Sequence, residues 1–215
     1  MIKAIIFDMD GVLVDAKHWH FEALNSALEL FGFHISQFEH HQRFDGLPTR
    51  EKLRTLAREN SFPLSLSEFV NEMKQKCLLE TAEKHCEPNP VHLSALERLR
   101  ADGYELALAS NSIRRSVDRL MRLTSLAPLL SFTLSNEDVA QAKPNPEIYE
   151  LAIRRLNVRA NECLVIEDGD YGIAAAEAAG ASVLRVENTQ QVSYQNIIRR
   201  IDELEDFGLS RSLVA

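Results

Sequence analysis

Two pairs of acidic residues in this sequence each follow a short apolar run. Asp8 and Asp10 come after a run near the start of the chain, and Glu167 and Asp168 follow a second run far along it. Carboxylate oxygens clustered without histidine or cysteine suit a hard cation, and Mg²⁺ is the natural choice. We therefore expect Asp8, Asp10, Glu167 and Asp168 to form a magnesium site.

Polar residues at two other places are suited to a phosphoryl group. Ser110 and Asn111 follow a third apolar run, and Lys143 precedes the expected start of a helix. A metal beside Asp8 would reduce the repulsion between an anionic nucleophile and a phosphate, while a lysine and a hydroxyl bind the phosphoryl oxygens. Aspartate is an established type of nucleophile toward phosphate, and a second carboxyl two residues later can move protons. These residues predict phosphoryl transfer with Asp8 as nucleophile, Asp10 as general acid and base, and Ser110 and Lys143 on the phosphate.

Five short apolar runs that do not alternate with polar residues are typical of strands buried on both faces of a sheet. They lie at residues 4–7, 105–109, 131–134, 163–166 and 182–186. Segments with helical periodicity lie between them, at residues 93–100, 117–123, 146–156 and 173–179. This alternation predicts an α/β fold with a doubly wound parallel sheet. Ligands bind such sheets beyond the carboxyl ends of the strands, which is where the polar residues stand.

The connection between the first and second strands breaks this alternation. It contains no strong strand, only helical stretches at residues 20–31, 50–59 and 66–83. It is far longer than the roughly 2–6 residues of an ordinary strand-to-helix connection. We therefore predict a helical cap domain at residues 16–88, inserted into an α/β core formed by residues 1–15 and 89–215. The return hinge is expected at residues 86–90, where two prolines block a helix.

The composition limits the partners and the compartment. The chain has 215 residues, of which 45% are hydrophobic and 26% charged, as in an ordinary globular protein. Its formal net charge of −8 disfavours nucleic acid and anionic membranes as partners. Cys77, Cys86 and Cys163 fit neither a disulfide framework nor a zinc site, and the start of the chain is unlike a signal peptide. We therefore expect a cytoplasmic protein that acts on a small molecule, not on nucleic acid or a membrane.

Four ordered motifs span nearly the whole chain. They are FDMDGVL at residues 7–13, SNS at 110–112, KPNP at 143–146, and ED at 167–168 followed by Gly172. Together they resemble the motifs of the haloacid dehalogenase (HAD) superfamily of phosphatases and phosphomutases. The resemblance is to the subgroup with a helical cap after the first strand, which includes enzymes similar to β-phosphoglucomutase and phosphoglycolate phosphatase. It implies a Rossmann-like core, a phosphorylated aspartate and Mg²⁺ as cofactor.

The resemblance implies a role for each motif residue. Asp8 resembles the nucleophile and a metal ligand, and Asp10 resembles the general acid and base, with its backbone carbonyl on the metal. Glu167 and Asp168 resemble the acids of the metal site, with Asp168 favoured as the direct ligand. Dehalogenating members use a lone aspartate where this chain has two, so Asp10 points away from dehalogenation. Gly169 departs from the subgroup, which often has serine there, and this affects the tuning of the site rather than the reaction.

The cap segment supplies further candidates for substrate binding. Residues 44–50 (FDGLPTR) resemble a substrate-specificity loop, which makes Gly46 and Arg50 candidates, and His20 lies where mutase-type members carry a histidine near the cap. Asn111, next to the phosphate-binding serine, is a fourth candidate. Alternatively, His20 marks only a helix start, and Arg50 is only a solvated helix charge. The other histidines of the cap are expected at the surface: His34, His40 and His41.

These features favour a monomeric phosphatase that hydrolyses a small phosphorylated metabolite, a sugar or polyol phosphate. The alternative is a phosphomutase of the β-phosphoglucomutase type, in which His20 and Arg50 would hold a second phosphate. Ala16, where mutases commonly carry a hydroxyl residue, and the SNS motif favour hydrolysis. A receiver-type signalling domain also uses acids, a lysine and a phosphorylated aspartate, but a domain of that small size has no use for a long cap.

Overall fold

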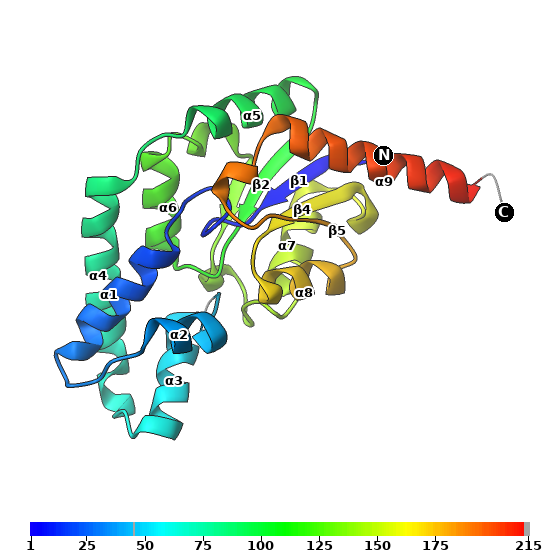
Figure 1. Cartoon of the computed structure of the whole chain (residues 1–215). Helices are drawn as coiled ribbons and strands as arrows, with labels where there is room; N and C mark the ends of the chain where they lie inside the picture. The colour runs from blue at the N-terminus through cyan, green and yellow to red at the C-terminus, as the bar shows by residue number, and fades with distance from the viewer. Residues whose placement is uncertain (45, 213–215) are drawn as a thin grey trace.

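The computed structural model describes residues 1–44 and 46–212, and a parallel sheet lies at its centre (Figure 1). Its five strands are β1 (Ala4–Phe7), β2 (Glu105–Ala109), β3 (Phe132–Leu134), β4 (Cys163–Glu167) and β5 (Ser182–Arg185), in the order β3-β2-β1-β4-β5. Each predicted run therefore forms a strand, and the α/β fold is confirmed. Phe7 of β1 pairs with Leu108 of β2 and Ile166 of β4, so the segments that follow these three strands begin side by side.

Helices cover both faces of this sheet. One face carries α5 (Pro90–Ala101), α6 (Arg114–Leu123) and α9 (Tyr194–Ser212). The other face carries α7 (Glu147–Leu156) and α8 (Asp170–Ala178). None of the helical segments predicted from the sequence corresponds to α9. In the described part of the chain, no helix combines the length and the apolar character needed to cross a membrane.

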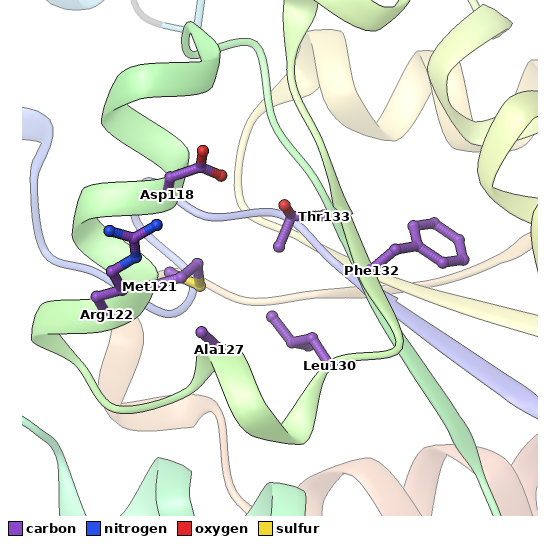
Figure 2. Close-up of a pocket in the computed structure, with 7 residues that line it drawn as sticks. All are labelled: Asp118, Met121, Arg122, Ala127, Leu130, Phe132 and Thr133. Carbon is purple, nitrogen blue, oxygen red and sulfur yellow. The ribbon is translucent and has the colours of Figure 1, made fainter.

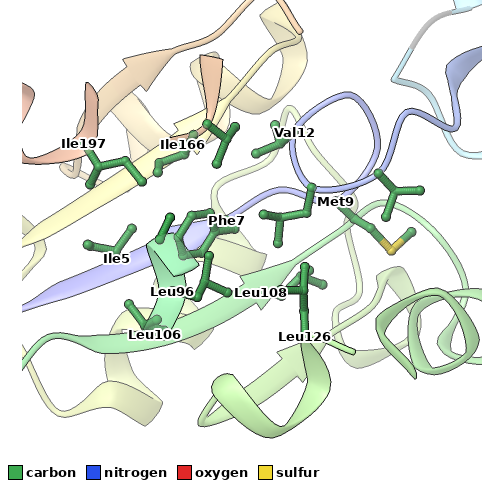
Figure 3. Packing of buried hydrophobic residues seen from close by; sticks show 14 of the residues in the cluster. Ile5, Phe7, Met9, Val12, Leu96, Leu106, Leu108, Leu126, Ile166 and Ile197 are labelled. Carbon is green, nitrogen blue, oxygen red and sulfur yellow. The ribbon is translucent and has the colours of Figure 1, made fainter. Parts of the chain in front are cut away.

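The alternation of side chains along β1 explains why this strand is apolar throughout. Ile5 and Phe7 pack in a cluster with Leu96 of α5 and Ile197 of α9 (Figure 3). Ala4 and Ile6 point to the opposite face and pack with residues of α7 and α8. All four residues of the strand are fully buried, because both faces of the sheet are covered.

The helical insert predicted between the first two strands is confirmed (Figure 1, blue to cyan and teal). It consists of α1 (Lys17–Glu29), α2 (Gln37–Glu39), a π-helical turn (His40–Phe44), α3 (Thr49–Asn60) and α4 (Ser67–His85). The insert has its own apolar core, in which Leu24 of α1 packs in a cluster with Leu53 of α3 and Val70 of α4. Asp45, which belongs to the predicted specificity loop, lies outside the described residues.

Two helix starts differ slightly from the prediction. Pro90 was expected in a hinge, but it is the first residue of α5, and the side chain of Asn89 caps the helix by accepting a hydrogen bond from the N–H of Val91 at 2.9 Å. Proline fits the first helical position because its missing N–H has no partner there in any case. Similarly, α7 begins at Glu147, whose N–H donates to Asn145 Oδ1 at 3.0 Å.

Two hollows lie along the flank of α6. One, of about 270 Å³, lies between α6 and the edge strand β3 and is lined by residues that include Met121, Leu130 and Phe132 (Figure 2). The other, of about 570 Å³, lies between α4 and α6 and is lined mainly by charged side chains. No predicted site residue lines either hollow. The polar residues that follow β1, β2 and β4 therefore mark a different place from these hollows.

Candidate active site

Lys143 joins two of the predicted acids at the carboxyl end of the sheet. Its Nζ atom lies 2.6 Å from Asp8 Oδ1 and 2.7 Å from Glu167 Oε1, and it donates to the carbonyl oxygen of Ala109 at 2.8 Å. All three charged side chains are buried. Burial opposes the charged form of Lys143, but the carboxylates of Asp8 and Glu167 outweigh burial and raise the pKa of the lysine. Lys143 is therefore a fixed positive charge between two acids.

Three carboxylates form a group that could hold a metal ion. Asp8, Glu167 and Asp168 each offer one oxygen, and these oxygens lie within 4.8 Å of one another. Burial, and then the negative charge of Glu167, raise the pKa of Asp8 well above its usual range, so an added cation would stabilise its ionised form. A set of oxygen donors without histidine or cysteine fits a hard divalent cation such as Mg²⁺. An aspartate in this setting is suited to attack an anionic group that the same cation binds.

Glycines make room for two of these acids. A Cβ atom at Gly172 would lie 1.8 Å from Glu167 Oε1, and one at Gly11 would lie 1.8 Å from Asp168 Oδ2. Gly11 also has a φ of +90°, in the left-handed region that favours glycine. Gly169 differs, because no atom outside its immediate chain neighbours lies within 4 Å of a Cβ placed there. The serine that the subgroup often carries at this position would therefore fit.

The carboxylate of Asp10 faces the helical insert. Ser112 Oγ donates to Asp10 Oδ2 at 2.9 Å, and His20 Nε2 of α1 lies 3.1 Å from Asp10 Oδ1. On the other side of the imidazole, Lys74 Nζ of α4 lies 2.7 Å from His20 Nδ1. Burial would raise the pKa of Asp10, but His20 and the hydrogen bond from Ser112 outweigh it, and the pKa is lowered. A series of polar contacts therefore runs from Lys74 of α4 through His20 of α1 to Asp10 of the core.

Lys74 was not singled out in the sequence, although the sequence carries a signal for it. Lys74 interrupts the apolar stripe of α4 at the helical spacing between Val70 and Leu78, so it faces inward. It is buried, and burial, followed by the nearby charge of Lys52, lowers its pKa to about 7. A lysine on the apolar face of a predicted helix is thus a marker for an internal polar site.

The prediction that His40 is a surface residue is wrong. His40 is only 6% exposed, because its ring packs edge-on against Phe21 at a centroid distance of 5.2 Å. Its Nε2 atom lies 3.2 Å from the buried Nζ of Lys52. The insert therefore holds two lysine–histidine contacts, one buried and one partly buried, and the partly buried contact continues to Asp10.

The predicted substrate-binding residues separate into two groups. Asn111 links the insert to the core, because its Nδ2 donates to the carbonyl oxygen of Gly46 at 2.9 Å and its Oδ1 accepts from the N–H of Lys143 at 3.0 Å. His20 also reaches the core, through Asp10. Arg50, in contrast, is exposed in the first turn of α3. The structure thus brings Asn111, Gly46 and His20 together with core residues of the site and leaves Arg50 at the surface.

Two more side chains contact the acids and were missed in the sequence. The hydroxyl of Tyr149 in α7 donates to Glu167 Oε1 at 2.5 Å, and Lys17 Nζ lies 2.6 Å from Asp168 Oδ2. A tyrosine among the apolar residues of a helix is indistinguishable in sequence from an ordinary core residue. A lysine at the start of a helix is expected in solvent. The sequence therefore contains no signal for either contact.

Comparisons with known proteins agree with this geometry. Residues 5–186 match the family model of the haloacid dehalogenase-like hydrolases. A phosphorylated carbohydrates phosphatase of Thermotoga maritima is 34% identical over 182 residues, which cover 83% of this chain and 82% of that protein.

Two solved structures share the fold. A β-phosphoglucomutase of Clostridium difficile has a TM-score of 0.81 at 24% identity and covers 94% of this chain and 98% of its own. CbbY of Rhodobacter sphaeroides, in complex with xylulose-(1,5)bisphosphate, has a TM-score of 0.78 at 22% identity and covers 90% of this chain and 91% of its own. These two structures support the fold, and the family model with the Thermotoga maritima relative shows that the chain belongs to the haloacid dehalogenase-like hydrolases, as an enzyme of the family's phosphatase type.

Proposed function

We propose that this enzyme is a Mg²⁺-dependent phosphatase that hydrolyses a small sugar or polyol phosphate through a phosphorylated Asp8. The observation that carries the proposal is the position of Asp8, which is held by Lys143 and grouped with Glu167 and Asp168. A bound Mg²⁺ would lower the repulsion between the phosphate and the carboxylate of Asp8. Lys143 and Ser110 stabilise the phosphoryl oxygens as negative charge spreads over them.

Asp8 acts as the nucleophile, and Asp10 transfers the protons. An oxygen of Asp8 attacks phosphorus, the bond from phosphorus to the ester oxygen breaks, and Asp10 gives that oxygen a proton. Asp10 then takes a proton from water, the water oxygen attacks phosphorus, and inorganic phosphate leaves with Asp8 restored. His20, 3.1 Å from Asp10, lowers the pKa of Asp10, which supports the second step, in which the carboxylate takes a proton from water. We assign the metal to Asp8, Glu167 and Asp168 and to the backbone carbonyl of Asp10.

Residues 16–88 act as a cap domain that selects the substrate. The hydrogen bond from Asn111 to the carbonyl of Gly46 supports closure of this segment over the core. We assign substrate recognition to His20, Gly46 and Arg50 of the cap and to Asn111 of the core. The Thermotoga maritima relative is named for phosphorylated carbohydrates, which supports the sugar or polyol class.

A screen of sugar and polyol phosphates for phosphate release tests this function. Excess chelator should abolish release on the best substrate, and Mg²⁺ should restore it. Asp8→Asn should lower turnover by several orders of magnitude, and Asp10→Asn by roughly 10²–10⁴-fold. Asp202→Asn, in an exposed acid of α9, is the matched control and should leave turnover unchanged. Substantial turnover by Asp8→Asn, or full turnover in chelator, would contradict the proposal.

Product analysis separates hydrolysis from the mutase reaction. A hexose 1-phosphate is supplied with and without the corresponding hexose bisphosphate. We expect free phosphate and free sugar in equal amounts in both cases. Isomerised sugar phosphate that requires the bisphosphate, without matching free phosphate, would establish a mutase instead.

A further inference from the structure

A cation from the helical insert contacts one acid of the proposed metal site. Lys17 is the first residue of α1, and its Nζ atom lies 2.6 Å from Asp168 Oδ2. The side chain of Asp168 is only 6% exposed, whereas that of Lys17 is 38% exposed. The ammonium group therefore reaches inward from the base of the insert to a carboxylate that is nearly cut off from water.

The backbone beneath this ion pair is shaped to admit it. Gly11 forms a tight turn in which its N–H donates to the carbonyl oxygen of Val14 at 2.7 Å. A Cβ atom at Gly11 would lie 1.8 Å from Asp168 Oδ2 and 2.6 Å from Cε of Lys17. Both partners of the ion pair thus lie against the same glycine, and a Cβ there would displace the carboxylate of Asp168 itself.

Two lysines contact the group of acids, one from the core and one from the insert. Lys143 of the core forms ion pairs with Asp8 and Glu167. Asp168 adds a further negative charge to this buried group of acids. Lys17 supplies the compensating charge from the insert.

We propose that Lys17 is a resident counter-ion of Asp168 that competes with the divalent cation for this carboxylate. Metal binding then separates the ion pair and removes one contact between the insert and the core. The proposal rests on the metal site of the proposed function. Mg²⁺ and an ammonium group on the same carboxylate repel each other, and the repulsion is strong where little water screens it. Metal binding must therefore overcome the attraction between Lys17 and Asp168, and the apparent affinity for Mg²⁺ is lowered accordingly.

Calorimetric titration of the full chain with Mg²⁺, in the absence of substrate, tests this competition. Lys17→Gln should bind Mg²⁺ about tenfold more tightly than the unaltered chain, a change of about 1.4 kcal/mol. Lys17→Arg keeps the charge and should stay within about twofold of the unaltered chain. Lys76→Gln is the matched control, because it removes an exposed cap lysine whose ion-pair partner is Glu80, 4.0 Å away on the same helix. It should leave Mg²⁺ affinity unchanged.

Thermal melting supplies a second measurement that needs no catalytic activity. Without Mg²⁺, Lys17→Gln should melt below the unaltered chain, because Asp168 has lost its counter-ion. The rise in melting temperature on adding saturating Mg²⁺ should be larger for Lys17→Gln than for either Lys17→Arg or Lys76→Gln.

The outcomes separate this inference from the proposed function. If the unaltered chain binds Mg²⁺ and Lys17→Gln binds it equally or more weakly, the competition is refuted while the phosphatase stands. A higher KM for substrate with unchanged Mg²⁺ affinity would place Lys17 on the substrate instead and would also refute it. If the unaltered chain binds no Mg²⁺ at all, both the inference and the metal dependence of the proposed function fail.

Discussion

Replacing Tyr149 with phenylalanine would isolate one buried hydrogen bond beside the acids. The ring of Tyr149 is fully buried, and its hydroxyl donates to Glu167 Oε1 at 2.5 Å, the same oxygen that contacts Lys143. Phenylalanine keeps the ring and its packing and removes only the hydroxyl. Hydrogen bonds to charged groups contribute about 1.5–3 kcal/mol, and a buried carboxylate cannot replace the lost donor with bulk water. We therefore expect Tyr149→Phe to lower the free energy of unfolding by about 1.5–3 kcal/mol.

The chain contains a matched control for this change. The hydroxyl of Tyr194 donates to Asp102 Oδ2 at 2.7 Å, but this hydrogen bond is exposed. Water can replace the donor there, so Tyr194→Phe should lower the free energy of unfolding by at most about 1 kcal/mol. Its stacking against Arg98 involves the ring and is retained.

Urea unfolding of the two variants and the unaltered chain measures both losses. For a chain of this size, 1 kcal/mol corresponds to about 2–4 °C in melting temperature, so Tyr149→Phe should melt about 3–12 °C lower. Equal losses for the two variants would show that burial does not set the strength of these bonds. A loss below about 0.5 kcal/mol for Tyr149→Phe would show that the hydrogen bonds from Lys143 and from the N–H of Asp168 satisfy Glu167 without the hydroxyl.

Three further changes test other parts of the structure. Gly169→Ser should change the free energy of unfolding by no more than about 0.5 kcal/mol in urea, because the position has an ordinary φ of −106° and open space at Cβ. Gly11→Ala should lower the melting temperature strongly and weaken Mg²⁺ binding in calorimetry, because the alanine Cβ would clash with Asp168. A variant with an unchanged melting temperature and unchanged Mg²⁺ affinity would show that there is no such clash. The pKa of Lys74 is about 7 when folded and about 10.4 when unfolded, so between these values the unfolded chain holds more protons and the free energy of unfolding rises with pH. Urea unfolding from pH 7 to pH 10 should show a smaller rise for Lys74→Met than for the exposed control Lys76→Met, and equal slopes would argue against the lowered pKa.

The strands and the acids that follow them were predictable because one physical rule governs both. A strand covered on both faces must be apolar throughout, so its end is visible where the first acid appears, as it is at Asp8 after β1. Parallel strands place such ends at one edge of the sheet. For this reason Asp8 and Glu167 could be expected together, and Lys143, which precedes α7, contacts both of them.

The polar contacts made by side chains of the insert could not be predicted in the same way. Lys17, Lys74 and His40 come from helices or helical turns, where a basic residue is normally solvated and only the packing of neighbouring elements turns it inward. The contacts from Lys74 through His20 to Asp10 depend on how α1 and α4 pack against each other, and no spacing along the sequence predicts that packing. Only the position of Lys74 on an apolar stripe gave a local sign of burial.

The central place of β1 also determines when this site is complete during folding. β1 is the first strand of the sheet along the chain, but its partners are β2 and β4, through pairs such as Phe7–Leu108 and Phe7–Ile166. Contacts between residues so far apart form slowly, because a long loop must close before they stabilise anything. During synthesis, the apolar strand that leads to Asp8 is made before β2 and β4 and remains unpaired on one side until β4 has been made, which is a state prone to aggregation. Recovery of activity on refolding should therefore follow the pairing of β1 with β4 rather than the formation of the helices.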